Sequence, residues 1–304
     1  MEQQVIRIGT RDSKLAMWQA YQVEYQLKSL GCKTDIVAVK SPGDLDLQTP
    51  LHQFGTTGIF TKVLDVALQE NRIDLAVHSL KDYPTETPEG LALPAVLKRG
   101  PHQDILVHKG DTSFLEEPES EATIATGSIR RIAQWKYRYP RHQSTALRGN
   151  VQTRLRKLQE NNWQGAIFAK AGLERIDLLP ANHLVLHWMI PAPAQGIIGL
   201  GCRDSDLKLK DLLKRVNHPE TFLCAKIERG FLNKVEGGCS APVGAYAFLK
   251  GKNIHFHGAV FELDGSAKFE NKQVVDLAQA ESVAETAAKQ VLAEGAQKIM
   301  EKLR

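Results

Sequence analysis

Arginine side chains are concentrated in the middle third of the chain. Those of greatest interest lie in loops or at the starts of predicted helices: Arg130, Arg131, Arg148, Arg154 and Arg175. A planar guanidinium binds a carboxylate through two parallel hydrogen bonds, so several arginines in one region suit a ligand with several carboxylates. The pattern predicts a site for a polyanionic molecule.

One cysteine lies in a flexible loop. Cys239 follows two glycines and precedes a serine, which suits a thiol that must reach into a cavity and stay accessible. The alternative is that Cys239 is a small buried apolar residue. The remaining cysteines lie in or beside apolar segments, and we expect structural roles for them: Cys32, Cys202 and Cys224.

A charged pair ends an apolar segment that is typical of a buried strand. Lys81 and Asp82 follow Ser79 there, and Asp82 could orient a ligand or exchange a proton. The alternative is a turn aspartate, since Asp favours turns and Tyr83-Pro84 come next.

Two further segments repeat one arrangement, a strand, a glycine and a helix start with arginine in its first turn. Thr126 and Ser128 precede Arg130 and Arg131 in the first segment. Helix starts attract anions and disfavour cations, so such arginines need a compensating negative charge, for which a bound anion is one source. A solvated basic face is the alternative.

The second segment carries Arg148 and Arg154 around Asn150, a plausible N-cap. Arg11 and Ser13 lie between the first predicted strand and helix, where ligands usually bind, although Ser13 could simply cap that helix. An ion pair with a neighbouring carboxylate would explain Arg175 equally well.

Several classes of protein are excluded or disfavoured. Neither a dinucleotide-binding glycine motif nor a P-loop is present. The pairs His183/His187 and His255/His257 have no third ligand in reach, so no metal site is predicted. The net charge of +4 does not indicate nucleic acid. No apolar run approaches the roughly 18 residues that span a bilayer, and no signal-peptide pattern or CxxC spacing occurs, which favours the cytoplasm.

Alternating strands and helices must position these groups. The predicted strands are residues 5–9, 35–39, 73–80, 91–97, 104–108, 123–126, 145–147 and 166–169, and the predicted helices are residues 13–30, 59–68, 129–139 and 151–160. This alternation predicts mainly parallel α/β sheets. Residues 189–196 are typical of a linker. Strands at 243–249 and 254–261 and a helix at 278–302 predict a small α+β domain at the end of the chain.

These segments together resemble the porphobilinogen deaminase (hydroxymethylbilane synthase) family from about Val5 to Ala247. The most specific matches are residues 7–13 (RIGTRDS), 76–82 (AVHSLKD), 128–131 (SIRR), 147–151 (LRGNV), 193–196 (PAQG) and 237–239 (GGC).

The resemblance implies two α/β domains similar to periplasmic binding proteins around a cleft, and a small α+β domain with the cysteine loop. The implied domains are residues 1–98 with 197–217, residues 99–196, and residues 218–304.

The implied reaction is the stepwise condensation of four porphobilinogen molecules, with loss of ammonia, on a covalent dipyrromethane primer, followed by hydrolytic release of the linear tetrapyrrole. A growing pyrrole chain gains two carboxylates per unit, which gives the many arginines a reason. The implied enzyme is a monomer that passes its product to the next tetrapyrrole-pathway enzyme. The alternative to an enzyme is a non-catalytic two-domain module that binds anions.

The resemblance also implies roles for particular residues. Asp82, Arg11 and Arg148 are the implied catalytic residues, with Asp82 stabilising positive charge and assisting proton transfer. The implied cofactor-binding residues are Cys239, through a covalent thioether, and Ser79, Lys81, Asp82, Thr126, Ser128, Arg130, Arg131, Arg154 and Gly172. The implied substrate-binding residues are Arg11, Ser13, Arg148, Arg175 and Gln195.

Five positions depart from the common pattern of the family. Thr57 and Gln53 stand where lysines are frequent, Gly127 where serine is common, Lys170 where a small residue is usual, and Ala194 where glycine is frequent. The missing loop lysines put contacts from residues 53–58 in doubt. One hypothesis is that Lys170 supplies a replacement positive charge.

Overall fold

The computed structural model describes residues 5–40, 59–117, 119–235 and 241–303. Its contacts divide the chain into two compact units. Unit 1 comprises Met1–Gly100 and Gly196–Phe222, and unit 2 comprises Pro101–Gln195 and Leu223–Arg304. The predicted division into three domains stays a prediction, since residues 101–195 and the C-terminal segment fall within one unit.

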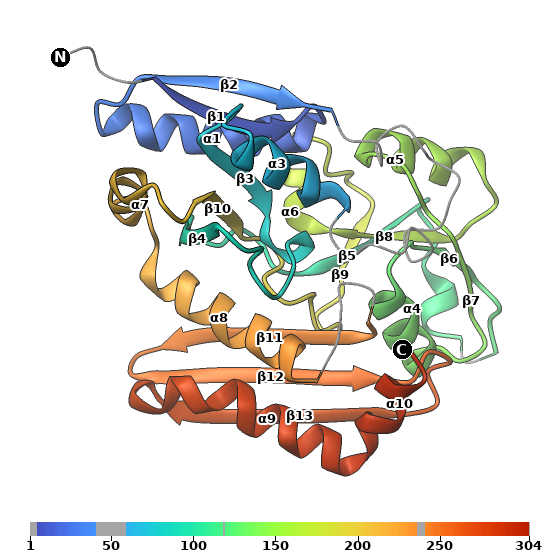
Figure 1. Ribbon diagram of the computed structural model, residues 1–304. Coiled ribbons are helices and arrows are strands. Elements are labelled where there is room, and N and C mark those ends of the chain that lie inside the picture. The colour runs from blue at the N-terminus through green and yellow to red at the C-terminus, as the bar shows by residue number, and fades with distance from the viewer. Residues whose placement is uncertain (1–4, 41–58, 118, 236–240, 304) are drawn as a thin grey trace. The chain divides into compact units, whose positions relative to one another are not determined.

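Unit 1 contains a five-stranded sheet with the order β2-β1-β3-β10-β4 (Figure 1). Strand β1 is parallel to β2 and β3, whereas β10 is antiparallel to β3 and β4. The sheet is mixed rather than mainly parallel because β10 returns from a distant part of the chain. The strands are β1 (Ile6–Arg11), β2 (Thr34–Val39), β3 (Leu75–Ser79), β4 (Leu91–Val96) and β10 (Ile198–Arg203).

The helices of unit 1 bury one apolar side each against this sheet. Helix α1 contributes Ala20, Val23 and Leu27, all fully buried, to a core that includes Ile8 and Leu200. Spacings of three and four residues place such side chains on one face of a helix. The described helices are α1 (Lys14–Ser29), α3 (Ile59–Gln69), the 3₁₀ turn η2 (Leu80–Asp82) and α7 (Leu207–Lys214); α8 (Pro219–Lys234) begins in unit 1 and continues into unit 2.

Unit 2 contains a second five-stranded mixed sheet with the order β7-β6-β8-β5-β9. Strand β6 is parallel to β7 and β8, and β5 is antiparallel to β8 and β9. Its strands are β5 (Asp104–His108), β6 (Thr123–Ala125), β7 (Gln143–Thr145), β8 (Gly165–Ala169) and β9 (His183–Val185). Its helices are α4 (Ile129–Arg138), α5 (Val151–Glu160), α6 (Lys170–Glu174) and the 3₁₀ turn η3 (Ser113–Leu115).

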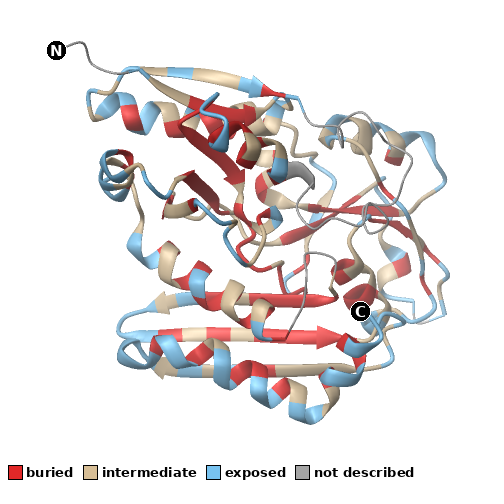
Figure 2. Ribbon diagram, in the orientation of Figure 1, coloured by how far each residue is buried: buried red, intermediate tan, exposed pale blue. Residues whose placement is uncertain are grey.

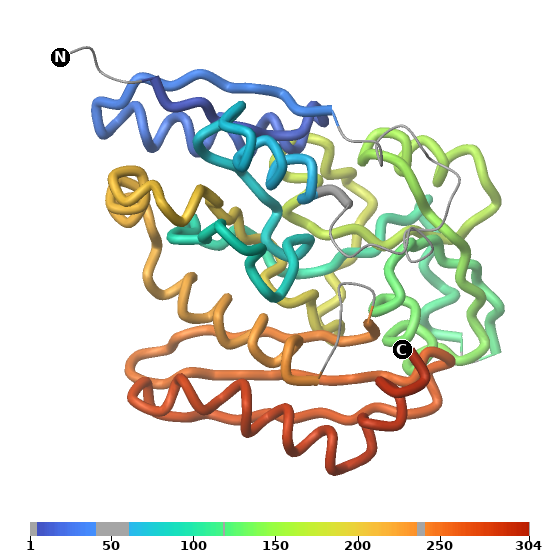
Figure 3. The backbone as a smooth tube through the Cα atoms, viewed as in Figure 1, coloured from blue at the N-terminus to red at the C-terminus, as the bar shows by residue number. Residues whose placement is uncertain are grey.

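The C-terminal part of unit 2 is an antiparallel sheet of three strands, β11 (Val243–Lys250), β12 (Asn253–Phe261) and β13 (Lys268–Asp276). The chain then returns along this sheet through helical segments (Figure 3). One sheet face packs against α8 and α9 (Val283–Val291) in a core that includes Phe231, Phe256 and Val283. The outer sides of these helices are exposed (Figure 2). The predicted α+β character of this segment is confirmed, with β13 in addition to the two expected strands.

The predicted single helix over residues 278–302 is wrong. The segment consists of a 3₁₀ turn (Leu277–Ser282), α9 (Val283–Val291), a π turn (Leu292–Ala296) and α10 (Gln297–Glu301). The break occurs at Gly295, whose φ is 132°. A Cβ at Gly295 would lie 2.8 Å from the Phe269 ring on β13, so the close approach of that ring requires glycine.

Candidate functional site

The turn that carries Asp82 is anchored in unit 1 by its neighbours. The Leu80 N–H donates to the Ile197 carbonyl at 3.0 Å, and Tyr83 is buried with its ring 4.7 Å from that of His78. Lys81 is half-buried and Asp82 is exposed. This short 3₁₀ turn therefore presents an accessible lysine–aspartate pair from a fixed backbone.

Strands β1 and β3 bring a second group of predicted residues to the same edge of the unit 1 sheet. Arg11 is the last residue of β1 and Ser79 the last of β3, and the two strands are adjacent and parallel. The Ser79 hydroxyl and the Gln19 amide hydrogen-bond, with Gln19 Nε2 donating at 2.9 Å. Ser13 caps α1, because its hydroxyl accepts from the Ala16 N–H at 3.3 Å. The cap is one of the two roles considered for Ser13, and its predicted contact with substrate stays a prediction.

Arg130 and Arg131 share one buried carboxylate in unit 2. Asp104 is fully buried, and its Oδ2 lies 2.7 Å from Arg130 Nη1 while its Oδ1 accepts from Arg131 Nη2 at 2.7 Å. Arg131 also donates to the Ile167 carbonyl at 2.9 Å. Burial lowers the pKa of Arg130, and the nearby Asp104 carboxylate opposes this shift. Two guanidiniums and one carboxylate leave one excess positive charge in this cluster.

Asp104 is the functional residue that the sequence reasoning missed. It supplies negative charge that the paired arginines at the start of α4 were expected to need. It also accepts from Gln195 Nε2 at 3.0 Å, and the same amide donates to the His102 carbonyl at 2.7 Å. An aspartate at the first position of the apolar strand segment Asp104–His108 was the available signal.

The start of α5 holds the second pair of arginines. Asn150 caps this helix as predicted and accepts from the Thr153 N–H at 2.9 Å. Arg154 Nε donates to the Gly149 carbonyl at 2.7 Å. Arg148 is half-buried, and its Nη1 is buried with no hydrogen-bond acceptor among the residues that the structure describes. A buried donor of this kind is costly unless a ligand atom completes its hydrogen bonding.

The predicted residues of unit 2 gather at one edge of its sheet. Strands β6, β7 and β8 are parallel, so the segments that follow them leave the same edge. Asp104 reaches this edge from the opposite direction, since it pairs with Ala169 at the end of β8. The segments after these strands carry Thr126, Ser128, Arg130, Arg131, Arg148, Arg154, Gly172 and Arg175.

Arg175 and Lys170 lie at the two ends of α6. Burial lowers the pKa of Arg175 to about 10. Lys170 Nζ lies 3.3 Å from Glu174 Oε1, an ion pair within one helix. This partner is local, so the proposed replacement role of Lys170 stays a hypothesis.

Two of the remaining departures from the family pattern, Ala194 and Gly127, lie in the described residues. Ala194 has a φ of 61°, in the left-handed region that favours glycine, which explains why glycine is frequent there. Its N–H donates at 2.7 Å to Glu228, which is fully buried. A Cβ at Gly127 would lie 2.7 Å from the Leu147 carbonyl oxygen, so serine would require a shift here. Cys239, Gln53 and Thr57 lie outside the described residues.

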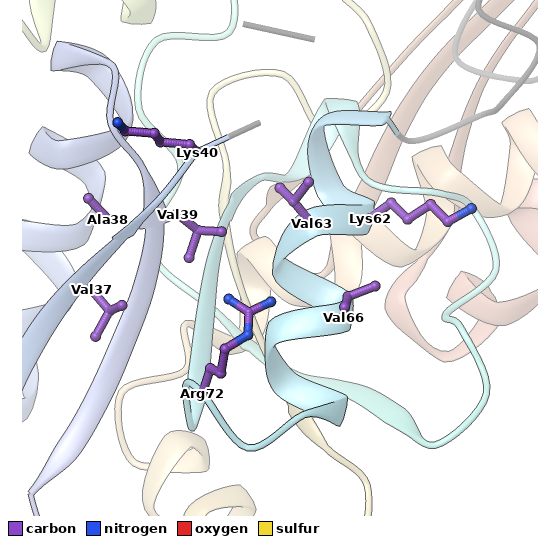
Figure 4. A pocket seen from close by; sticks show the side chains of 8 residues that line it. All are labelled: Val37, Ala38, Val39, Lys40, Lys62, Val63, Val66 and Arg72. Carbon is purple, nitrogen blue, oxygen red and sulfur yellow. The ribbon is translucent and has the colours of Figure 1, made fainter. Parts of the chain in front are cut away.

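A cavity of about 620 Å³ in unit 1 contains none of the predicted site residues in its lining. It lies between β2 and α3, where Val39 faces the helix and Lys62 points away (Figure 4). Its walls are apolar at Val37, Val39, Val63 and Val66 and cationic at Lys40, Lys62 and Arg72. Because none of the predicted site residues lines it, this cavity is set apart from the candidate site. In the described ranges no group of histidine, cysteine or acidic residues could hold a metal ion, and no helix is long and apolar enough to cross a membrane.

Comparisons with known proteins match nearly the whole chain. The family model "Porphobilinogen deaminase, dipyromethane cofactor binding domain" matches residues 6–211, and "Porphobilinogen deaminase, C-terminal domain" matches residues 222–293. The porphobilinogen deaminase of Syntrophomonas wolfei is 38% identical over 97% of both chains. The probable porphobilinogen deaminase of Methanocaldococcus jannaschii is 45% identical over 82% of this chain and 85% of its own. The chloroplastic porphobilinogen deaminase of Oryza sativa is 40% identical over 88% and 77%.

Two solved structures that match about 70% of the chain have little sequence in common with it. The periplasmic VFT2 domain of Bordetella pertussis BvgS is 12% identical, with a TM-score of 0.43 over 70% of this chain and 86% of its own. A probable amino-acid transporter extracellular-binding protein of Bacillus subtilis is 10% identical, with a TM-score of 0.44 over 70% and 90%.

Proposed function

The chain belongs to the porphobilinogen deaminase family, and we propose that the predicted residues gathered at the sheet edge of each unit are its binding groups. Its activity is that of a hydroxymethylbilane synthase, a transferase of tetrapyrrole biosynthesis with a dipyrromethane cofactor-binding domain. The observation that carries the proposal is the gathering of predicted residues at one edge of each sheet.

The side chains at these edges fit a group that carries several carboxylates. In unit 2 the excess positive charge of the Arg130–Arg131–Asp104 cluster and the buried donor of Arg148 call for anionic oxygens. Bound dipyrromethane supplies the primer to which porphobilinogen is added. Its proposed holders are Cys239, through a thioether, and Ser79, Lys81, Asp82, Thr126, Ser128, Arg130, Arg131, Arg154 and Gly172.

Arg130 and Arg131 are proposed to act mainly through their charge. Several of their donors are already engaged by Asp104, Ile167 and Ile190, where the Ile190 carbonyl accepts from Arg130 Nη1 at 2.7 Å. A fixed, buried guanidinium pair stabilises a nearby carboxylate without reorganising when it binds.

Asp82 is the proposed acid–base and electrostatic group of the reaction. Its turn is anchored by Leu80 and Tyr83, so the backbone that carries this carboxylate is fixed, and from there the carboxylate could exchange a proton with a bound pyrrole. Arg11 and Arg148 are proposed to position the reacting substrate through its carboxylates. Ser13, Arg175 and Gln195 complete the proposed substrate contacts.

Replacing Asp82 by Ala tests this assignment. We expect turnover of porphobilinogen to fall by about two to four orders of magnitude, the range typical of a lost general acid–base group, with an unchanged circular dichroism spectrum. The exposed Asp211, in an ion pair with Lys214, provides the control Asp211→Ala, which should keep wild-type turnover. Wild-type turnover of the Asp82→Ala variant would remove this carboxylate from the mechanism.

The mass of the intact denatured protein tests the tether at Cys239. We expect added mass equal to two condensed pyrroles on the wild type and not on the Cys239→Ser variant. The same added mass on both proteins would place the attachment elsewhere.

The oligomeric state and compartment are proposed to be a monomer in the cytoplasm. Free cysteines at Cys32, Cys202 and Cys224 support a reducing compartment. Light scattering of the purified protein and fractionation of the source cells test the two points, and the chloroplastic relative shows that the compartment can differ within the family.

A further inference from the structure

The C-terminal sheet of unit 2 has a second face that its core does not use. Side chains alternate between the two faces of a strand, so Phe256 and Val260 point into the core with α8 and α9 while His257 and Phe261 point to the opposite face. On β13, Lys268, Glu270 and Lys272 share that opposite face, because they pair with Phe261, Ala259 and His257.

This opposite face forms one wall of a cavity of about 690 Å³. The other wall consists of α4, residues 186–191 and the segment around His102, all within unit 2. Two glycines allow the walls to approach closely, because neither has a side chain. A Cβ at Gly244 would lie 2.8 Å from Ile190, and one at Gly265 would lie 2.4 Å from the Tyr137 nitrogen. The walls are therefore in close backbone contact, and the cavity between them is formed before any ligand arrives.

Flat rings line this cavity. His102 and Tyr246 are stacked with centroids 3.9 Å apart and planes 16° apart. The Arg138 guanidinium lies 5.1 Å from the Trp188 ring centroid, and Lys268 Nζ lies 5.4 Å from that of Tyr137. Rings with nearby cations favour a planar ligand that carries negative charge at its edge.

The charges around the cavity are unbalanced. Glu270 lies 2.8 Å from Lys268 and 3.5 Å from Lys272, and it also accepts from His257 at 2.9 Å. Burial lowers the pKa of His257, and the hydrogen bond with Glu270 opposes this shift. Arg138 lies over the Tyr139 and Trp188 rings and donates to the Tyr139 hydroxyl, and its contacts among the described residues include no carboxylate. Two lysines and one arginine thus face a single carboxylate, which leaves two positive charges in excess.

We propose that this cavity is a second ligand site, separate from the arginine-rich sheet edge, which binds planar aromatic dicarboxylates. The ligand ring packs beside Tyr246, Trp188 and Tyr137, which keep the ring and cation contacts given above, and the two carboxylates reach Lys272 on one wall and Arg138 on the other. The volume lies in the range of ordinary small-molecule sites and accommodates one or two fused rings.

The test is an isothermal calorimetric titration of the holoenzyme with naphthalene-2,6-dicarboxylate. We expect saturable binding of one equivalent at this site, weakened on the order of tenfold in the double variant Arg138→Gln/Lys272→Gln. The control variant Lys289→Gln changes an exposed lysine on α9 and should bind like the wild type. Cyclohexane-1,4-dicarboxylate, which has the charges but no aromatic ring, should bind at least tenfold more weakly.

Three results would overturn the proposal. The first is undiminished binding in the double variant, and the second is equal binding of the saturated dicarboxylate. The third is loss of binding in Arg148→Gln while the double variant still binds, which would assign the probe to the sheet edge described above. Retained binding in Arg148→Gln is the expected result, and it holds whether or not Arg148 acts in the reaction.

Discussion

Replacement of Asp104 by Asn should strongly destabilise unit 2. The substitution keeps the size of the side chain and removes its charge, and it places an amide NH₂ or carbonyl opposite two guanidiniums. Asp104, Arg130 and Arg131 have side chains that are 0%, 5% and 7% exposed, so water cannot replace the lost carboxylate.

The magnitude follows from the contacts that are lost. Asp104 accepts from Arg131 Nε at 3.1 Å and Nη2 at 2.7 Å and from Gln195 Nε2 at 3.0 Å, and it lies 2.7 Å from Arg130 Nη1. Removing one partner of a buried ion pair costs about 3–5 kcal/mol because the remaining charge stays buried. For a unit of this size, such a loss corresponds to a fall in Tm of roughly 6–20 °C.

Tryptophan fluorescence during thermal unfolding provides the assay. Trp135, Trp163 and Trp188 lie in unit 2, and Trp18 lies in unit 1, so a Trp18→Phe background reports unit 2 alone. The matched control is Glu121→Gln, also in unit 2, whose carboxylate is 73% exposed and lies 3.3 Å from Arg141. An exposed pair contributes about 1 kcal/mol or less, so the control should lower the Tm by only a few degrees.

A small effect would refute this reasoning. If Asp104→Asn unfolded within a few degrees of Glu121→Gln, the two arginines would not depend on Asp104 for compensation. The charge of the buried cluster, and with it the proposed role of the pair toward carboxylates, would then need another explanation.

Three further predictions concern single residues. Burial raises the pKa of Asp65 to about 6, so its ionisation should destabilise unit 1 as pH rises from about 4 to 7. The variant Asp65→Asn should therefore have a free energy of unfolding about 1–2 kcal/mol higher than the wild type at pH 7.5 and nearly equal to it at pH 4, as measured by urea unfolding. Burial would raise the pKa of Asp74, but hydrogen bonds from Arg7 and Arg203 outweigh it and hold the pKa at about 2. Its stabilising effect is therefore complete above pH 4 and lost as pH falls toward 2, and hydrogen exchange of β3 should show this loss in the wild type and not in Asp74→Asn. Ala194→Gly should relieve about 1 kcal/mol of left-handed strain, partly offset by the greater freedom of the unfolded chain, and an unchanged or slightly raised Tm is expected; a large fall would contradict the strain.

Helices and strands with strong apolar periodicity could be predicted from the sequence. The helices Ile129–Arg138 and Val151–Glu160 and the strand Asp104–His108 begin where expected, because glycine, serine or asparagine precedes each helix and an apolar run marks the strand. Strand β13 could not be found in this way. Its sequence KFENKQVVD is polar on both faces, since one face borders the cavity and the other meets a short helix.

Partners far apart in the sequence were the main source of error. The antiparallel entry of β10 and the pairing of Asp104 with Arg130 and Arg131 depend on contacts that no local pattern encodes. Three arginines of the candidate site were nevertheless visible, because Arg130, Arg131 and Arg154 follow a glycine or a cap residue at the start of a helix. The arginines that could bind an anion can thus be found from the sequence, whereas the carboxylate that compensates their charge cannot.

The place of β10 in its sheet has a consequence for synthesis of the protein on the ribosome. Strand β4 pairs only with β10 in the described sheet, and β3 needs β10 to cover its second edge. Residues 1–100 therefore emerge with an incomplete sheet, and the sheet can be completed only after β10, which ends at Arg203, has been synthesised. At translation rates of about 5–20 residues per second, that interval is roughly 5–20 s. During it an exposed apolar edge is open to mispairing, so chaperone binding to nascent chains should be strongest in this window and end once β10 has left the ribosome.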